Sequence, residues 1–271
     1  MTPVSVGGWD NRSFHLGDSM LVRLPSAAGY VPQVEKEHRL LPMLAPHLPL
    51  QIPVPLALGR PGEGFAWPWS VYRWIEGETV RSAGLADMAG FARDVARFLA
   101  ALQAIDASNG PPAGAHNFHR GGDLRVYDGQ SRRAMATLGA EIDGITAREI
   151  WETALASRWE NTPVFVHGDI ADGNLLMRDG RLAAVIDFGC SGVGDPSADL
   201  VIAWNTLDSA GRRAFRQALP LDAPAWARGR GWALWKALIS LAERHHDAAD
   251  AQLQRRVIAA IIADHREETV R

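Results

Sequence analysis

The 271-residue sequence contains one cysteine and very little lysine. Because Cys190 has no second cysteine with which to form an intramolecular disulfide, we expect a reduced, cytoplasmic protein. Of the 28 basic residues only Lys36 and Lys236 are lysines, and all the others are arginines. We therefore expect any fixed cation in an active site of this protein to be an arginine.

Long apolar runs and an excess of positive charge are also missing. No apolar stretch approaches the ~18 residues of a membrane span, and the first residues, MTPVSVGGWD, lack the charged start and apolar core of a secretion signal. The net charge of −3 gives no basic surface of the kind that nucleic-acid binding needs. We therefore expect neither a membrane nor a nucleic acid as a partner.

The first 76 residues have the pattern of a small strand-rich lobe. Alternating runs predict strands at 12–17, 19–25, 53–59 and 69–75, and helical spacing of apolar residues predicts one helix over 33–45. Pro42 lies inside this helix, so we expect it to kink the helix or to end it early.

From residue 77 onward the pattern predicts a larger, mainly helical lobe, which extends to residue 271. A long amphipathic helix covers 85–105, a loop rich in Gly and Pro covers 108–124, and the chain is helical again from about 198. Between them lie strands at 163–166, 175–178 and 181–186, of which the last two are joined by Asp179-Gly180, a strong hairpin signal. The sequence predicts a two-lobed α+β fold.

One polar segment stands out between the apolar runs of this second lobe. His167, Asp169 and Asn174 form the pattern H-G-D-x-x-x-x-N, and Asp187-Phe188-Gly189 follows across the predicted hairpin. The two patterns match the catalytic-loop and D-F-G signatures of kinases, with glycine in place of the usual arginine. The hairpin folds the chain back, so Asn174 and Asp187 can face one point with the oxygen ligands that Mg²⁺ prefers.

Either pattern alone would be a weak signal, because Asp and Asn are common turn-forming residues. Together, in this order and separated by a strand, a tight turn and a strand, they indicate phosphoryl transfer. Such transfer requires groups that position the substrates and neutralise charge. Asp169 is free to orient an attacking hydroxyl or to accept its proton. A phosphate-binding G-x-x-x-x-G-K-[ST] loop does not occur in the sequence.

The sequence resembles the aminoglycoside phosphotransferase-like small-molecule kinases, which are relatives of the protein kinases. The resemblance covers nearly the whole chain and is carried by the segments 8–17, 21–25, 167–176, 185–189 and 194–200. It implies a two-lobed protein-kinase-like fold and transfer of the γ-phosphate of ATP or GTP, with Mg²⁺, to a hydroxyl of a small molecule. Under this resemblance Asp169 is the catalytic aspartate, Asn174 and Asp187 are the magnesium ligands, and His167 fixes the loop.

The resemblance also implies a nucleotide site in the first lobe. Arg23 stands where the family usually has a phosphate-binding lysine, and Glu37 is its expected partner, with Glu35 as a competitor. Lys36 is an implausible substitute, because neighbouring helix positions face apart. The loop 6–14 would cover the nucleotide and Ser13 would contact a phosphate, but the loop has no G-x-G-x-x-G.

The junction strand resembles the hinge that holds the base in such kinases. The base would bond the backbone at Arg73 and Ile75, and Tyr72 would close the back of the pocket, although ordinary core packing explains Tyr72 equally well. After D-F-G we expect Asp195 and Asp199 to cap a helix and to hold the loop, and we expect Cys190 to be a small packing residue. Trp232 and Trp235, three residues apart on a helix, are expected in the core.

The acceptor is the least determined part of the prediction. The resemblance favours an aminoglycoside, and Glu243, Asp247 and Asp250 could face a polycation, although a solvated helix face explains them equally well. The segment 117–120 contains a histidine and an arginine, which would suit a neutral or anionic acceptor better. Alternatives are a kinase for a macrolide, amino alcohol or sugar metabolite, and a catalytically silent nucleotide-binding module. A protein kinase is disfavoured because 194–200 replaces the A-P-E segment.

Overall fold

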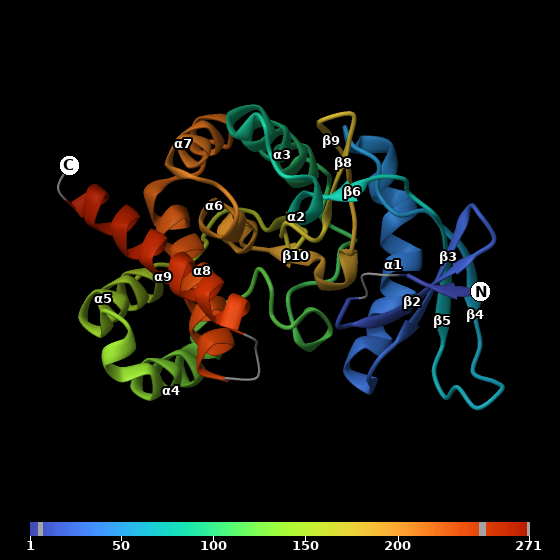
Figure 1. Ribbon diagram of the computed structural model, residues 1–271, viewed down its shortest axis with the longest axis horizontal. Coiled ribbons are helices and arrows are strands. Elements are labelled where there is room, and N and C mark those ends of the chain that lie inside the picture. Colours follow the sequence, from blue (N-terminus) through green and yellow to red (C-terminus); the bar gives the residue numbers. More distant parts are fainter. Residues whose placement is uncertain (5–7, 244–247, 270–271) are drawn as a thin grey trace.

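A computed structural model describes residues 1–4, 8–243 and 248–269 and has two lobes (Figure 1). The first lobe is a five-stranded antiparallel sheet with the strand order β1-β2-β3-β5-β4. Its strands are β1 (Thr2–Pro3), β2 (Asn11–Leu16), β3 (Met20–Pro25), β4 (Pro55–Gly59) and β5 (Trp69–Arg73). The fold is the α+β, protein-kinase-like fold that the sequence predicts.

The helix of the first lobe, α1 (Val31–Leu44), joins this sheet to the larger lobe. Its buried residues include Val34, Leu41 and Leu44, which repeat at helical spacing. The expectation that Pro42 ends this helix early is wrong, because α1 continues through Pro42 to Leu44.

The larger lobe is built mainly from helices. They are α2 (Val80–Ala83), α3 (Met88–Gln103), α4 (Asp128–Leu138), α5 (Gly144–Leu155), α6 (Ile202–Asn205), α7 (Ser209–Ala218), α8 (Ala223–Ala242) and α9 (Ala248–Thr269). The segment after 198 is helical as predicted, but it is divided by N-cap aspartates at 208 and 222. Within the described residues no helix is both long and apolar enough to cross a bilayer.

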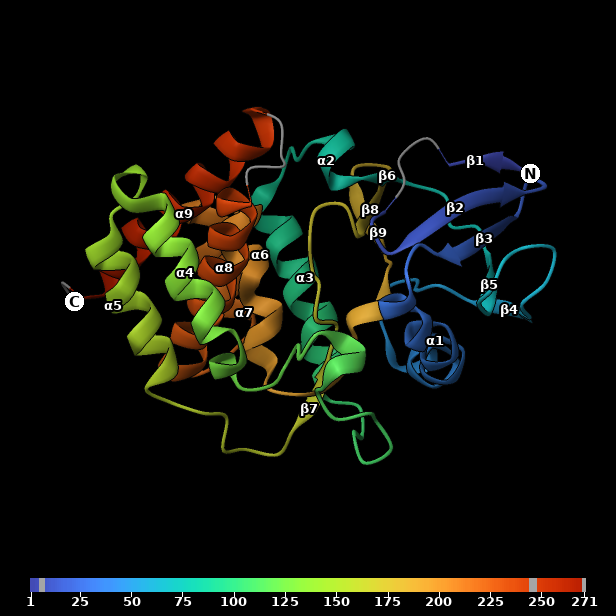
Figure 2. The same ribbon diagram turned by 90° about the horizontal axis from the view of Figure 1, so that it is seen from below.

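Short strands carry the polar motif between the two lobes. They are β6 (Glu78–Thr79), β7 (Val164–Val166), β8 (Leu175–Arg178), β9 (Arg181–Val185) and β10 (Gly192–Gly194). The turn between β8 and β9 has positive φ angles of 53° at Asp179 and 73° at Gly180, as an Asp-Gly hairpin requires. Both views place this hairpin between the first lobe and the helices (Figures 1 and 2).

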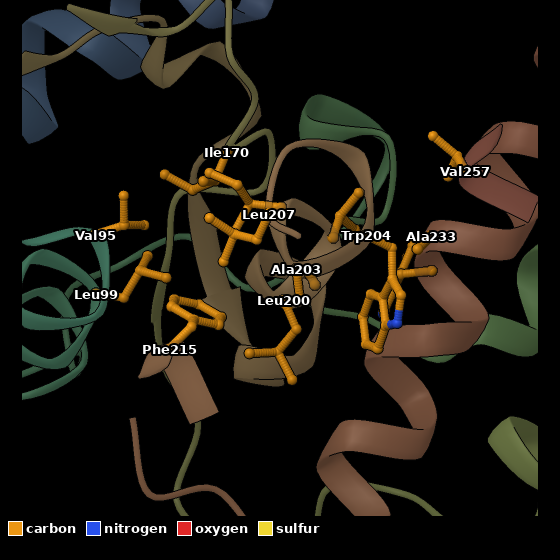
Figure 3. Close-up of a cluster of buried hydrophobic side chains, with 14 of the residues drawn as sticks. Val95, Leu99, Ile170, Leu200, Ala203, Trp204, Leu207, Phe215, Ala233 and Val257 are labelled. Atoms are coloured by element: carbon orange, nitrogen blue, oxygen red, sulfur yellow. The ribbon is translucent and has the colours of Figure 1, made fainter. Parts of the chain in front are cut away.

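An apolar core lies directly beneath the catalytic motif (Figure 3). Ile170, which follows Asp169, is 2% exposed and belongs to the same buried cluster as Val95 and Leu99 of α3 and Phe215 of α7. Burying a side chain of this size stabilises the fold by roughly 1.5–3 kcal/mol. The loop that carries Asp169 is therefore held from below by core packing.

A buried ion pair connects the segment after D-F-G to the core helix α8. Asp195 caps the 3-10 helix Pro196–Val201 by accepting a hydrogen bond from the backbone N–H of Ser197 at 3.0 Å, as predicted. The same carboxylate accepts a hydrogen bond from Nε of Arg228 at 2.7 Å, and both side chains are less than a tenth exposed. Arg228 also donates to the hydroxyl of Ser157 at 2.8 Å.

We expect Arg228→Met to lower the free energy of unfolding by about 3–5 kcal/mol, because it leaves the carboxylate of Asp195 buried without its partner. The measurement is urea unfolding followed by circular dichroism. Arg255→Met is the matched control, because Arg255 pairs with Glu141 at 3.1 Å on the surface and its side chain is 51% exposed. The control should lose less than about 1 kcal/mol, and equal losses in both variants would contradict the argument.

Candidate active site

The β8–β9 hairpin brings Asn174 and Asp187 to the same end of the sheet. The backbone N–H of Ile186 donates to the carbonyl of Asn174 at 2.9 Å, so Ile186 lies opposite Asn174 and Asp187 is the next residue along the chain. The side-chain amide of Asn174 donates to the backbone carbonyl of Asp169 at 2.9 Å and to its carboxylate at 3.2 Å. This arrangement engages the amide nitrogen of Asn174 and leaves its side-chain oxygen for another partner.

Asp169 lies in a positively charged environment. Nζ of Lys236 donates to Oδ1 of Asp169 at 2.6 Å, and the side chains are 35% and 28% exposed. Burial would raise the pKa of Asp169, but Lys236 and Arg120 outweigh it and lower the pKa to about 2. Asp169 is therefore ionised throughout the neutral range and is better suited to orient a hydroxyl than to act as a strong base.

Asp199 holds the backbone of the catalytic loop. Its two carboxylate oxygens accept hydrogen bonds from the backbone N–H groups of His167 at 2.8 Å and Gly168 at 2.7 Å, and its side chain is fully buried. Burial raises the pKa of Asp199 to about 7, and the two N–H donors oppose that rise. The prediction that Asp199 ties down the loop is confirmed.

His167 is a buried residue that orients the same loop. The N–H of Asp169 donates to Nδ1 of His167 at 3.2 Å, so Nε2 carries the proton and donates to the carbonyl of Ile186 at 3.0 Å. Burial lowers the pKa of His167, which keeps the ring neutral in this arrangement. The ring also packs edge-on against Phe188 of the D-F-G segment.

Close contacts explain why residue 168 is a glycine. Gly168 has φ of 82°, and a Cβ at this position would lie 2.4 Å from the carbonyl oxygen of Cys190 and 2.9 Å from Cβ of Arg120. The arginine that kinases commonly have at this position cannot fit here. Arg120, from a different segment, lies against the glycine instead.

Arg23 of β3 connects the first lobe to Asp187. Its guanidinium donates to Glu37 of α1 at 3.3 Å and to Oδ1 of Asp187 at 2.7 Å. Tyr72 donates its hydroxyl to the same Glu37 carboxylate and is 1% exposed. Glu35, the alternative partner, is exposed, so the ion pair forms with Glu37, as we preferred.

Of the other predicted nucleotide contacts, the structure describes Ser13 and only part of the covering loop. Ser13 lies within β2 rather than in the covering loop, but it is directly opposite Arg23 in the register and therefore on the same face of the sheet. Val6 and Gly7 of the predicted covering loop lie outside the described residues.

The structure limits which backbone group of Arg73 could bond a base. The backbone N–H of Arg73 already donates to the carbonyl of Val54 at 2.9 Å, so Arg73 has only its carbonyl oxygen to offer a base. Ile75 follows Trp74, whose N–H donates to the carbonyl of Ser19 at 2.8 Å. Tyr72 is a core residue and donates its hydroxyl to Glu37, and its place at the back of a nucleotide pocket stays a prediction.

Lys36 does not approach the proposed phosphate site. Its Nζ lies against the loop after Asp187, where it donates to the carbonyls of Gly189 at 2.6 Å and Ser191 at 3.0 Å and contacts Nδ1 of His116 at 3.1 Å. Burial lowers the pKa of Lys36 to about 8. Lys36 thus connects α1 to the D-F-G loop.

Cys190, Trp232 and Trp235 have the packing roles expected of them. Burial and the nearby carboxylate of Asp169 raise the pKa of the Cys190 thiol to about 12, which makes it unreactive at neutral pH. Trp232 and Trp235 are 1% and 5% exposed.

The side chains present fit a magnesium ion held jointly with a nucleotide. Among the described residues no group of three or more His, Cys, Asp and Glu side chains could hold a metal ion. Asn174 and Asp187 offer two oxygen donors, and Mg²⁺ commonly takes one or two protein carboxylates and completes its shell with phosphates and water. Arg23 donates a hydrogen bond to Oδ1 of Asp187, so a metal ion bound to this oxygen would have to displace or share that contact.

The sequence reasoning missed Lys236, and it considered Arg120 only for its effect on the choice of acceptor. The expectation that an active-site cation must be arginine is wrong, because Lys236 of α8 bonds Asp169. Arg120 acts on Asp169 from the 108–124 loop, where the sequence showed only a basic stretch. The scarcity of lysine was a usable signal, because neither of the two lysines lies on the open surface: Lys36 is buried and Lys236 is half-buried.

The structure describes two of the three carboxylates proposed for a polycation. Glu243 is exposed at the end of α8, Asp247 lies outside the described residues, and Asp250 on α9 is close enough to act on Arg81. Arg81 itself pairs with Asp172 of the catalytic loop at 3.0 Å.

Curated proteins with similar sequence are aminoglycoside kinases. An aminoglycoside 3'-phosphotransferase of Escherichia coli is 37% identical over 73 residues, which are 25% of this chain and 26% of that protein. One from Salmonella typhimurium is 30% identical over 119 residues, 42% of each chain. The alignments thus span less than half the length of these curated relatives.

Solved structures resemble the chain over nearly its whole length. The GDP and kanamycin complex of APH(2")-IIIa has a TM-score of 0.74 at 20% identity and covers 97% of this chain and 93% of that chain. The macrolide 2'-phosphotransferase MphH from Brachybacterium faecium has a TM-score of 0.58 at 24% identity, with 94% and 91% covered. At these identities the likeness establishes the fold.

The family assignment comes from the sequence as a whole. Residues 1–232, well over half of the chain, match the model of the phosphotransferase enzyme family. This match includes the catalytic loop, the hairpin and the segment that contains Asp199. The chain belongs to the phosphotransferase enzyme family.

Proposed function

We propose that this protein transfers the γ-phosphate of ATP or GTP to a hydroxyl of a small molecule, with an aminoglycoside as the acceptor. The observation that carries the proposal is that Asn174 bonds the carboxylate of Asp169 and pairs with Ile186, the residue before Asp187, while Arg23 reaches Asp187 from the first lobe. Phosphoryl transfer is catalysed mostly by positioning and by neutralising charge, and these groups supply both.

Each of these residues has a distinct part in the proposed reaction. Asp169 orients the acceptor hydroxyl and receives its proton as the new P–O bond forms. Arg23, fixed by Glu37, binds the phosphates of the donor, with Ser13 beside it on the same face of the sheet. The oxygens of Asn174 and Asp187 hold Mg²⁺, which neutralises phosphate charge when bound. The base lies against the junction after β5, where the Arg73 carbonyl and the Ile75 backbone face it and Tyr72 closes the pocket.

The acceptor is proposed from the relatives. The curated proteins that match in sequence act, by name, on aminoglycosides, and a structural relative holds kanamycin. A macrolide is the second candidate, because another structural relative is a macrolide kinase. The positive charge of Arg120 and Lys236 beside Asp169 also suits a less cationic acceptor.

We expect Asp169→Asn to lower turnover by on the order of 100- to 10,000-fold, the usual loss on removing a general acid or base. It should leave binding of the magnesium–nucleotide complex largely intact. Asp187→Ala should abolish turnover and also weaken nucleotide binding in the presence of Mg²⁺, because it removes a metal ligand. Steady-state kinetics and calorimetric titration of nucleotide with and without Mg²⁺ measure these effects.

Asp179→Asn is the matched control for these variants, since it lies in the hairpin turn and asparagine tolerates positive φ there. It should keep wild-type turnover. Wild-type protein that binds nucleotide but transfers nothing would instead support the silent nucleotide-binding module. Full turnover in both Asp169→Asn and Asp187→Ala would refute the kinase mechanism.

Arg23→Ala should raise KM for the nucleotide and lower kcat, each by roughly 10- to 100-fold, as expected for losing a charged hydrogen-bond donor. Arg23→Lys should recover part of this loss, because lysine keeps the charge but not the bidentate geometry. Glu37→Gln should resemble Arg23→Ala, whereas the exposed Glu35→Gln should behave as wild type. Unchanged kinetics for Arg23→Ala would place the phosphate-binding cation elsewhere.

The acceptor proposal is tested with a panel of aminoglycosides, macrolides and amino alcohols, each incubated with ATP or GTP and Mg²⁺. We expect a phosphorylated aminoglycoside, detected by mass spectrometry, and no product with Asp169→Asn. A phosphorylated macrolide without any aminoglycoside product would replace the first candidate by the second and leave the mechanism standing.

A further inference from the structure

Arg120 is a cation beside Asp169 without an anionic partner among the described residues. Its Cβ packs against Gly168, one residue before Asp169, and its charge lowers the pKa of Asp169. No ion pair involves Arg120 in the described part of the chain, and its Nε is buried without a hydrogen-bond partner. Arg120 is half-buried, and its positive charge is not paired with a carboxylate of the described residues and is therefore available to an anionic group.

The side chain of Arg120 is held by a rigid aromatic platform. Its guanidinium lies 4.5 Å from the ring centre of Trp235 and 5.5 Å from that of Trp232. Trp235 is fixed in turn, because its ring stacks on Tyr127 at 3.9 Å and its Nε1 donates to Gln130 at 3.0 Å. Because the rings already hold the side chain in place, little conformational entropy is lost when an arginine positioned in this way binds a ligand.

Lys236 follows Trp235 on α8 and supplies the second charge. Its Nζ donates to Oδ1 of Asp169 at 2.6 Å, and an ammonium group retains two further N–H donors. Lys236 and Arg120 therefore both lie near the ionised carboxylate of Asp169, while the nearby Asp199, whose pKa burial raises to about 7, carries only part of a negative charge near pH 7. On the nucleotide side the balance is reversed, because Arg23 faces both Glu37 and Asp187.

We propose that Arg120 and Lys236 form an anion site beside Asp169 that holds the phosphoryl group during its transfer. This inference rests on the proposed function and adds two residues that contact the reacting group from the acceptor side. The excess positive charge lies where negative charge must pass from donor to acceptor, and preorganised donors at such a position stabilise the transition state.

The step conserves atoms and electrons. The acceptor oxygen forms a bond to the γ-phosphorus, the bond from phosphorus to the β–γ bridging oxygen breaks, and its electron pair leaves with the nucleoside diphosphate. The hydroxyl proton passes to the carboxylate of Asp169. Arg120 and Lys236 donate hydrogen bonds to the non-bridging oxygens during transfer and in the phosphate product. With water as the acceptor, the same step gives inorganic phosphate.

An anion at this site could come from two sources, the donor phosphate or an anionic group of the acceptor. Hydrolysis of the nucleotide by water, without any acceptor, separates them. If the site holds the phosphoryl group, hydrolysis and transfer depend on it equally. If it holds an acceptor group, only the KM for that acceptor depends on it.

The experiment compares Arg120→Gln, Arg120→Lys, Lys236→Met and Lys236→Arg. Arg125→Gln is the control, because Arg125 lies on the same segment, pairs with Asp123 at 3.3 Å and is 43% exposed. The readouts are kcat for nucleotide hydrolysis, kcat and KM for transfer, and calorimetric titration of inorganic phosphate into the complex with ADP and Mg²⁺.

We expect Arg120→Gln and Lys236→Met to lower kcat for hydrolysis and for transfer by about 100-fold each, as on removal of one preorganised donor. KM values should change little, and the affinity for inorganic phosphate should fall about tenfold or more. Arg120→Lys and Lys236→Arg should recover part of each loss, and Arg125→Gln should match wild type.

Hydrolysis at the wild-type rate with a raised acceptor KM would overturn the proposal in favour of an acceptor-binding site. Unchanged phosphate affinity in the Arg120→Gln and Lys236→Met variants would overturn it as well. If the wild-type protein turns over no acceptor and no nucleotide, the proposed function fails, but phosphate titration still decides whether the anion site exists.

Discussion

The carboxylate of Asp199 is the constraint on which the arrangement of the active site depends. It accepts hydrogen bonds from the backbone N–H groups of His167 and Gly168, and it is fully buried. These bonds hold the backbone before Asp169 in one conformation. Ile170, on the other side of Asp169, is buried in the core of the larger lobe. With the chain fixed on both sides, the backbone of Asp169 is held in place, and the contacts with Lys236 and Asn174 orient its carboxylate.

Charge is distributed unequally on the two sides of the site. On the proposed nucleotide side, Arg23 bonds the carboxylates of Glu37 and Asp187, and Mg²⁺ would add the positive charge that phosphates require there. On the proposed acceptor side, the two positive charges of Lys236 and Arg120 lie near the negative charge of Asp169. A phosphoryl group moving between them would remain close to positive charge throughout.

The sequence determined the local structure of this protein, because local structure depends on neighbours in the chain. The β8–β9 hairpin follows from Asp179-Gly180 and the alternating apolar residues around it, and the motif residues Asn174 and Asp187 come together because the hairpin folds back. The cap at Asp195 follows equally from the proline after it. The hairpin and the cap were readable from the residues near them in the sequence, the two lobes were predicted from the change of pattern near residue 76, and the kinase-like fold was implied by the resemblance.

Only the tertiary structure decided which distant charges meet at the site. Lys236 lies 67 residues after Asp169. The residues around it in its helix do not show whether its side chain bonds a carboxylate or extends into solvent. Arg120 reaches Gly168 because a glycine there leaves room for a side chain from another segment. Glu37 rather than Glu35 pairs with Arg23 because the rotation of α1 against the sheet buries one and exposes the other. Such choices depend on how helices pack against the loop and the sheet, and packing is set by the whole core rather than by residues near in sequence.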